Sequence, residues 1–364
     1  MLVNEVAKII EQFAPLQLQE SYDNSGLCIG NPEQLVTGVL ITIDVTEPVI
    51  DEAIQQGCNL IISHHPLIFS GIKKITGKTY TEKCIIKAIQ NNIAIYSAHT
   101  NIDLVSEGVS KKMCDKLGLI NCQVLVPIKD ELRKLVTFIP TNSLEKVQEA
   151  IFKAGAGHIG NYDKCSFIVE GKGSFRGNEN TNPFVGEKGK LHFENETRIE
   201  TVFPKFLEKD IIKALLAAHP YQEVAYDIYP IENSYSLAGM GMIGELSEEI
   251  EEIQFLQNIK STFNAQCIKH TPLKGRKIKK IAVCGGSGSS FLPNAIQQGA
   301  DVFISADFKY HQFFDTENKI TIADIGHYES EQFTKEIFYD LLTKNFSNFA
   351  VRFSSINTNP INYL

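Results

Sequence analysis

The chain has 364 residues, of which 43% are hydrophobic and 21% are charged, and its formal net charge is −8 at pH 7. This length and composition predict an ordinary globular protein of two or three domains, with ample sequence for a large core. The acidic balance speaks against a nucleic-acid partner, because binding to a phosphate backbone calls for a basic surface.

The N-terminal segment NEVAKIIEQFAP, residues 4–15, predicts an amphipathic helix and lacks the charged-then-apolar layout of a signal peptide. No apolar run approaches the roughly 20 residues that a membrane-spanning helix needs. The eight cysteines include no Cys-x-x-Cys pair and lie mostly in apolar segments, which indicates buried free thiols. We therefore expect a cytoplasmic protein that does not contact a membrane.

Three segments share one order of helix end, tight turn, apolar strand and polar residues: AIQQGCNLIISHH (53–65), AIQNNIAIYSAH (88–99) and AIQQGADVFISAD (295–307). Strands that alternate with helices in this way predict parallel βαβ units, whether or not the copies record an internal duplication. Two further predicted strands, 39–43 and 319–322, are also followed by acidic or histidine residues. Because ligands of open α/β sheets bind beyond the carboxyl ends of the strands, these residues mark the candidate site.

A stretch of different character lies between the two α/β halves. From about 132 to 230 the predicted order is strand, helix, strand, a Gly- and Asn-rich span, strand, helix and strand, which is typical of a ferredoxin-like α+β sandwich. Residues 176–182 are the best candidate for a mobile loop. We predict a split α/β domain with parallel-rich sheets and helices outside, formed by 1–127 and 236–364 and interrupted by an inserted ferredoxin-like α+β domain at 128–235.

Five side chains of the kind that hold divalent metals lie at these strand and helix ends: His64, His65, Asp103, His327 and Glu331. His327 and Glu331 are four residues apart at the start of a predicted helix, which would place them on one face. His64 and His65 end an apolar strand and reach one site only if the chain turns there, which Pro66 favours. Imidazole and carboxylate ligands without thiolates suit Zn²⁺, Fe²⁺, Mn²⁺ or Co²⁺, and the sequence does not rank these ions.

Other polar residues near the strand ends have two interpretations each. Three aspartates are best explained as helix caps or turn formers: Asp44, Asp307 and Asp324. The GGSGSS segment, residues 285–290, either holds a phosphate with its backbone amides or forms a plain strand-to-helix turn. In the predicted insert, His219 and Tyr221 are interpreted as packing and turn residues.

The motifs, taken together, resemble the Nif-three-like family, also called the GTP cyclohydrolase I type 2 homologue family. They are YDNSGLCIG (22–30), SHHPLIF (63–69), SAHTNID (97–103), SADFKYH (305–311) and DIGHYESE (324–331). HPYQEVAYDIYP, residues 219–230, resembles the longer bacterial members, which carry an insert similar to PII and CutA proteins. The resemblance implies two divalent metal ions per subunit, held by the five ligands above, and a ring-shaped homohexamer whose sites face an interior cavity.

Two segments depart from the family pattern. Ser305-Ala306-Asp307 stands where Thr-Gly-Asp is frequent, so the backbone there is not expected in a conformation that only glycine adopts. Gly239-Met240-Gly241-Met242 stands where Gly-x-Gly-Arg is usual. If that arginine holds an anionic substrate in relatives, this chain lacks the contact.

Two functional hypotheses of different class follow. The first is a metal-dependent hydrolase of the GTP cyclohydrolase type that acts on a small molecule such as a nucleotide or related heterocycle, in which His99 or His311 transfers a proton or orients a ligand. The second is a non-catalytic metal-binding or regulatory oligomer whose inserted domain senses a ligand or partner. The sequence leaves open whether the protein is an enzyme.

Overall fold

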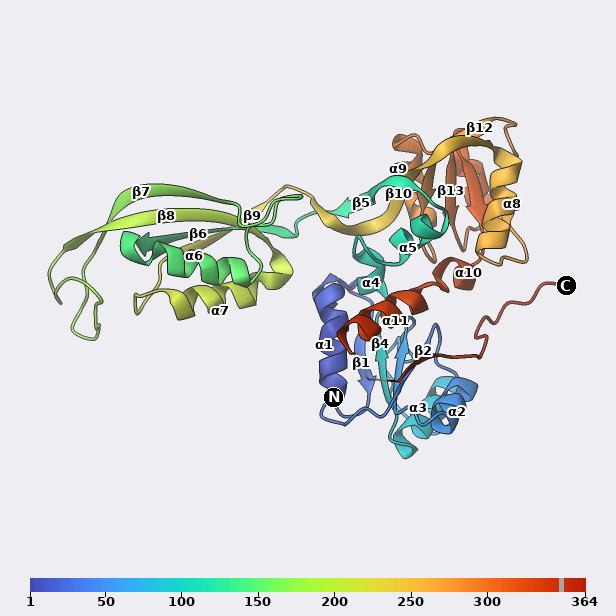
Figure 1. Cartoon of the computed structure of the whole chain (residues 1–364), viewed down its shortest axis with the longest axis horizontal. Coiled ribbons are helices and arrows are strands. Elements are labelled where there is room, and N and C mark those ends of the chain that lie inside the picture. The colour runs from blue at the N-terminus through green and yellow to red at the C-terminus, as the bar shows by residue number, and fades with distance from the viewer. Residues whose placement is uncertain (347–349) are drawn as a thin grey trace. The chain divides into compact units, whose positions relative to one another are not determined.

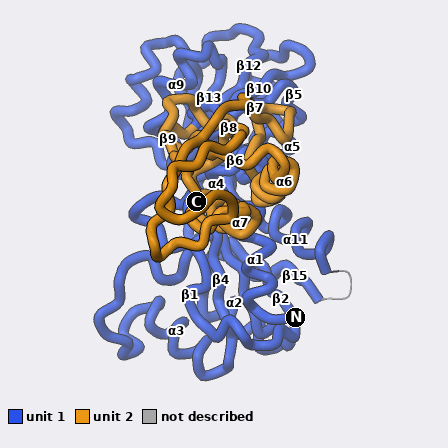
Figure 2. The backbone as a smooth tube through the Cα atoms, turned by 90° about the vertical axis from the view of Figure 1, so that its left-hand side faces the viewer, with its two compact units in different colours: residues 1–127, 237–364 blue, residues 128–236 orange. Residues whose placement is uncertain are grey.

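The chain forms two compact units, shown in different colours in Figure 2. The computed structural model describes residues 1–346 and 350–364. The first unit combines residues 1–127 and 237–364, and the second comprises 128–236. Within the described residues, no helix is both long enough and apolar enough to cross a membrane.

The first unit contains a five-stranded sheet of order β1-β4-β3-β2-β15. Its strands are β1 (Gly26–Ile29), β2 (Val39–Thr42), β3 (Leu60–Ser63), β4 (Ala94–Ser97) and β15 (Val351–Phe353). All neighbours are parallel except β1, which runs antiparallel to β4. The outer helices are α1 (Val3–Phe13) and α11 (Thr334–Asn345) on one face, and α2 (Glu47–Gln55) and α3 (Tyr80–Gln90) on the other (Figure 1).

Strand β3 shows why this sheet is covered on both faces. Ile61 packs into the core under α2 and α3, whereas Ile62 packs into the core under α1 and α11, and both are fully buried. A continuous apolar run is typical of a parallel strand between two helical layers. Only at its carboxyl end does the strand continue into polar residues, at His64 and His65.

The three similar sequence segments fold in the same way. Helix α2 leads into β3, α3 into β4, and α9 (Leu292–Gln297) into β13 (Val302–Ser305). Each turn places one residue in the left-handed region: Gly57, Asn92 and Gly299, with φ of 67°, 51° and 73°. Glycine and asparagine are the residues that adopt this conformation at least cost. In all three segments, polar residues therefore follow at the carboxyl end of the strand.

A six-stranded sheet of order β11-β14-β13-β12-β10-β5 completes the first unit. Its strands are β5 (Ile120–Ile128), β10 (Tyr235–Glu251), β11 (Lys269–His270), β12 (Lys277–Val283), β13 and β14 (Thr321–Asp324). Strands β12, β13 and β14 are parallel. Helices α5 (Val109–Lys116) and α8 (Glu252–Thr262) cover one face and α9 the other. The chain leaves the first unit from β5 and returns on β10, which are neighbours in this sheet.

The second unit has the order β6 (Leu132–Pro140), α6 (Leu144–Lys153), β7 (Ser166–Phe175), β8 (His192–Pro204), α7 (Glu208–Ala218) and β9 (Tyr226–Ile231). Its antiparallel sheet has the order β7-β8-β6-β9. Helices α6 and α7 pack on one face, over core residues such as Ile139 and Ile199. Residues on the opposite face, such as Phe167 and Val169, are exposed.

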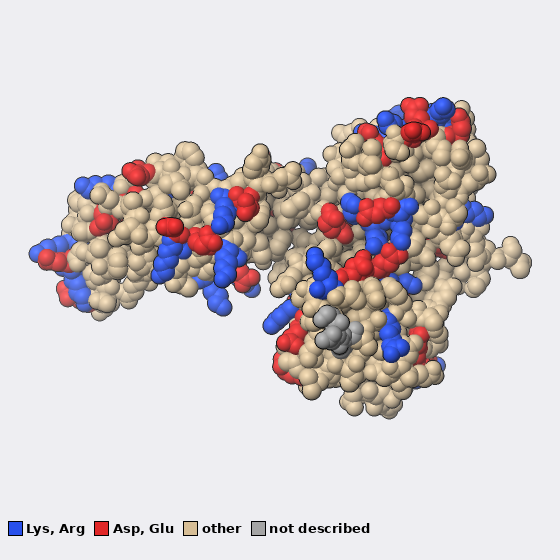
Figure 3. All heavy atoms as spheres, in the orientation of Figure 1, with Lys and Arg blue, Asp and Glu red and all other residues tan. Residues whose placement is uncertain are grey.

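These sheets confirm a mixed α/β fold with parallel-rich sheets. Two details differ from the sequence prediction. The predicted helix from residue 327 is two helices, α10 (His327–Glu331) and α11, and the C-terminal segment adds β15, which the sequence pattern did not indicate. On the face shown in Figure 3, acidic and basic side chains are interspersed. Glu336 of α11 forms ion pairs with Lys112 and Lys116 of α5.

Candidate metal centre

The first unit brings all five predicted ligands together. His64 and His65 directly follow β3, and Asp103 lies in the short helix α4 (Thr100–Leu104). His327 and Glu331 are the first and last residues of α10, which follows β14. The carboxyl ends of parallel strands from two sheets therefore supply the cluster.

The Glu331 carboxylate lies at the centre of the cluster. Its Oε2 atom is 2.9 Å from His65 Nε2, 3.1 Å from His327 Nε2 and 3.5 Å from His64 Nε2. The side chain is almost completely buried. One carboxylate oxygen that faces three imidazole nitrogens has the position expected of a ligand to a divalent cation.

Two buried polar atoms of the cluster have no hydrogen-bond partner among the described residues. They are His64 Nε2 and Asp103 Oδ1, which lie 3.7 Å apart. Buried polar groups are almost always satisfied, so each such atom calls for an explanation. A cation between the nitrogen and the oxygen would satisfy both, and these residues therefore fit a metal ion.

Each of the three imidazoles has its other nitrogen fixed. His64 Nδ1 is 2.9 Å from the Ala98 carbonyl oxygen, so Nδ1 carries the proton and donates it. His65 Nδ1 and His327 Nδ1 each lie 2.7 Å from an aspartate oxygen, of Asp44 and Asp307 respectively. Such partners fix the ring and leave Nε2 as the ligand atom, which is the arrangement found at many metal sites.

The roles of two aspartates therefore differ from the sequence interpretation. Asp44 and Asp307 were explained as caps or turn formers, but both accept hydrogen bonds from ring nitrogens of the cluster. Asp307 adopts a left-handed φ of 58°, which aspartate tolerates, next to Ala306. Asp324 does shape a turn, because its carboxylate accepts the backbone N–H groups of Phe308 and Gly326.

His99 lies beside the cluster, and His311 does not. The ring centroids of His99 and of His64 and His65 are 5.4 Å and 5.5 Å apart. His99 Nδ1 is 2.8 Å from Asp23 Oδ1. Asp23 lies in the YDNSGLCIG motif but was not predicted as a site residue. His311 is exposed in the 3₁₀ helix η5 (Tyr310–Thr316). Among the described residues, it is not part of a cluster of side chains that could hold a metal ion.

The carboxylates of the cluster raise the pKa of the two outer imidazoles. Burial lowers the pKa of His65, but hydrogen bonds to Asp44 and Glu331 outweigh it and raise the pKa to about 10. Burial likewise lowers the pKa of His327. The negative charge of Glu331 and the hydrogen bond to Asp307 outweigh burial and raise this pKa to about 11. Without a metal, protons neutralise this site, and a cation that binds displaces them.

The two carboxyl groups of the cluster shift in opposite directions. Burial and repulsion from Glu331 raise the pKa of Asp103 to about 8. Burial acts on Glu331 as well, but the neighbouring imidazoles of His64 and His327 hold its pKa well below the usual value. Two carboxylates this close are both ionised at low cost only when positive charge lies between them.

The GGSGSS segment lies against the Glu331 carboxylate, and its amides are not arranged to bind a phosphate. The Gly286 N–H donates to Ser330 Oγ and the Gly288 N–H to Ser305 Oγ, each at 2.9 Å, so these amides are occupied. Gly286 has φ of 60°, and a Cβ there would clash with Glu331 Oε1. The turn interpretation is therefore favoured, and Gly286 leaves the space that Glu331 fills.

Three overlapping groups have ligand atoms within 4.8 Å of one another: His64, His65 and His99; His65, His327 and Glu331; His64, Asp103 and Glu331. Their donors are imidazole nitrogens and carboxylate oxygens without sulfur. This set suits Zn²⁺, Fe²⁺, Mn²⁺ and Co²⁺.

Comparisons with known proteins cover nearly the whole chain. The family model described as Duf34/NIF3 (NGG1p interacting factor 3) matches residues 1–360. Relatives named GTP cyclohydrolase 1 type 2 homolog in Halalkalibacterium halodurans and Bacillus subtilis are each 38% identical, over 99% of this chain and 98% of their own length.

Two solved structures are similar over the full length. A Bacillus cereus protein related to NIF3 has a TM-score of 0.87 at 38% identity, and Staphylococcus aureus protein SA1388 has 0.79 at 30%. In both cases the match covers 100% of this chain and 99% of the other.

Proposed function

Because the chain belongs to the Duf34/NIF3 family, we propose that it binds two divalent metal ions around Glu331 and hydrolyses a nucleotide or a related heterocycle. The proposed ligands are His64, His65, Asp103, His327 and Glu331. The observation that carries the proposal is the position of Glu331 Oε2, within 3.5 Å of three imidazole nitrogens. The name of the relatives, GTP cyclohydrolase 1 type 2 homolog, suggests the substrate class.

The ligand geometry favours two ions over one. One group consists of His65, His327 and Glu331, and another of His64, Asp103 and Glu331, so each ion would have two ligands of its own and one in common. Three protein ligands leave positions for water or substrate, as in catalytic sites. Held by these residues, two ions would supply an activated water and a Lewis acid for the bond under attack.

His99 is the better supported of the two candidate proton-transfer residues. Asp23 holds its Nδ1, so Nε2 is the nitrogen that remains for the site, next to His64 and His65. His99 would then accept or donate a proton at Nε2, or complete the ligands of one ion. The corresponding role for His311 stays a prediction, because that side chain is exposed in η5.

The direct test is turnover by the metal-loaded full chain. We expect GTP or another nucleotide in a broad panel to be hydrolysed only with metal, as followed by liquid chromatography and mass spectrometry. His65→Ala should abolish turnover, whereas His158→Ala, which changes an exposed histidine of the second unit, should not. A protein with two bound ions per chain that converts no nucleotide would contradict the hydrolase proposal.

The aspartates behind the histidines provide a graded prediction. Asp44→Asn should lower metal affinity by roughly 10–100-fold, because loss of a carboxylate behind a metal-binding histidine has effects of this size. The change leaves His65 in place but removes the charge that holds its Nδ1 proton. Calorimetric titration with Zn²⁺ measures the effect. The matched control is Asp51→Asn, on a surface carboxylate paired with Lys87, and equal affinities of the two variants would rule out a positioning role.

One observation favours the second functional hypothesis, a non-catalytic metal-binding or regulatory protein. The ligands come from both sheets of the first unit, so bound ions would tie the end of β3 to the helix that follows β14. Ions with this role stabilise the fold whether or not they act on a substrate.

The assembly and location form part of the proposal. We infer that the second unit is a ferredoxin-like domain of the PII and CutA type, in a ring-shaped homohexamer in the cytoplasm. Its β-α-β-β-α-β order supports the domain type. Phe167 and Val169, which are 67% and 47% exposed on the edge strand β7 and do not line a pocket among the described residues, support self-association along that edge. Eight free cysteines fit a reducing compartment.

A further inference from the structure

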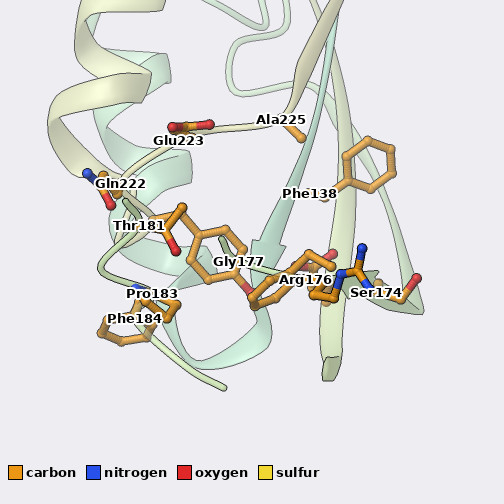
Figure 4. A pocket seen from close by; sticks show the side chains of 14 residues that line it. Phe138, Ser174, Arg176, Gly177, Thr181, Pro183, Phe184, Gln222, Glu223 and Ala225 are labelled. Atoms are coloured by element: carbon orange, nitrogen blue, oxygen red, sulfur yellow. The ribbon is translucent and has the colours of Figure 1, made fainter. Parts of the chain in front are cut away.

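The second unit contains a pocket of about 470 Å³, within the range of small-molecule sites (Figure 4). It lies on the sheet face away from α6 and α7, because Phe138 and Glu196 in its lining alternate with the core residues Ile139 and Ile199 along β6 and β8. In Figure 4, Phe184 lies on one side and Phe138 on the other. The pocket is entirely within the second unit and is separate from the metal centre.

A buried carboxylate without a cation forms part of the pocket wall. Glu196 is 9% exposed and accepts a hydrogen bond of 2.8 Å from the Tyr221 hydroxyl. Glu200, on the same face of β8, forms ion pairs with Lys134 and Arg198. Glu196 forms no ion pair among residues 1–346 and 350–364. Acidic side chains are rarely buried without a positive partner, so Glu196 has a place for one.

The histidine next to this carboxylate does not supply the charge. His219 Nε2 lies 3.0 Å from the Phe138 carbonyl oxygen and therefore donates to it, while His219 Nδ1 accepts the Tyr221 N–H at 3.1 Å. A ring that donates with one nitrogen and accepts with the other is neutral. Burial also lowers the pKa of His219 and raises the pKa of Tyr221. Within the described part of the chain, the side chain that donates to the Glu196 carboxylate is therefore an uncharged hydroxyl.

Aromatic rings form the apolar part of the pocket. Tyr221 lies between Phe175 and Phe184, with ring centroids 5.7 Å and 6.3 Å away and the planes inclined at 61° and 52°. Aromatic faces attract positive charge through their quadrupole, most strongly where water is excluded. Arg176 also lines the pocket, but it is exposed, so water and salt screen its charge.

We propose that this pocket binds a small organic cation, an amine or a protonated nitrogen heterocycle with an apolar or aromatic body, and that Glu196 is its counter-ion. The aromatic rings hold the body of the ligand, and the carboxylate selects its charge. The site belongs to the second unit alone and does not depend on the metal centre.

Tryptamine is a suitable probe, because the chain contains no tryptophan and indole fluorescence therefore reports only on the ligand. Tryptophol and indole-3-acetate have the same ring with a neutral and a negative side chain. We expect the full chain to bind tryptamine at least about tenfold more tightly than either. Glu196→Gln should remove this preference, because Gln keeps the shape and the Tyr221 hydrogen bond but not the charge.

Two further variants keep the test decisive. Glu200→Gln removes the same charge from the same strand outside the pocket and should leave tryptamine affinity unchanged. Phe184→Ala, at a 54% exposed side chain, should weaken tryptamine without unfolding the unit. Equal affinity for the three indoles, stronger binding of indole-3-acetate, or no saturable tryptamine binding at millimolar concentration would overturn the proposal. The proposal would also be wrong if Phe184→Ala dissociated the oligomer and neither the parent protein nor this variant bound tryptamine. The pocket would then be a contact between copies of the chain.

Discussion

Glu331→Gln should remove most of the bound metal from the first unit. The carboxylate oxygen that faces three histidines becomes part of a neutral amide, and the amide NH₂ repels a cation if it points inward. The loss of metal affinity should exceed the roughly 10–100-fold that the loss of a supporting residue costs. Elemental analysis of the purified protein, together with calorimetric titration of the metal-free form, measures it.

Glu329, the other glutamate of α10, provides the control. Glu329 is 6% exposed and accepts a hydrogen bond from Asn359 Nδ2, but it belongs to none of the metal-type groups among the described residues. Glu329→Gln should therefore bind metal as the parent protein does. If Glu331→Gln keeps two ions per chain at the parent affinity, the shared-ligand geometry is wrong.

Removal of the metal should lower the free energy of unfolding by about 4 kcal/mol for each ion that is present at about a thousand times its dissociation constant. Chelation leaves His64 Nε2 and Asp103 Oδ1 buried without partners and two carboxyl groups close together. Denaturant unfolding before chelation, after chelation and after return of Zn²⁺ gives the change and its reversibility.

Chelation also separates the two functional hypotheses. Loss of nucleotide turnover with the oligomer intact, as followed by sedimentation, supports the hydrolase, whereas dissociation of the oligomer supports a structural role for the ions. Glu331→Gln should lose little further stability on chelation, because it holds little metal. An unchanged free energy of unfolding in the parent protein would mean that no ion is bound by the folded state in preference to the unfolded chain.

The sequence predicted much of the fold because the relevant signals are local. Apolar runs such as 60–62 and 302–304 identify buried strands, and the Gly57 and Gly299 turns mark the residues at which helix passes into strand. The same local order predicts that polar residues collect at strand ends. Strand β15 escaped prediction because three residues carry no periodic pattern, and its pairing with β2 is a long-range contact.

The hydrogen-bond partners of the site residues were not predictable from the sequence, because they too are long-range contacts. Asp44 looks like a turn former within its own segment, and only the fold places it against His65. The amides of the GGSGSS turn looked free for a phosphate, but Ser330 and Ser305 reach them from other parts of the chain. Local sequence shows which groups can bond, whereas the tertiary fold decides which partner they find.

The chain leaves the first unit on β5 and returns on β10, and these two strands are neighbours in the six-stranded sheet. Strands β5 and β10 hold both ends of the insertion together, so closing that loop is part of forming the six-stranded sheet. Doubling the length of a flexible loop costs only about 0.6 kcal/mol in closure entropy. Insertions, deletions or replacement of everything between these two strands would therefore leave the metal ligands in place. Evolution can alter the inserted module and the metal centre separately.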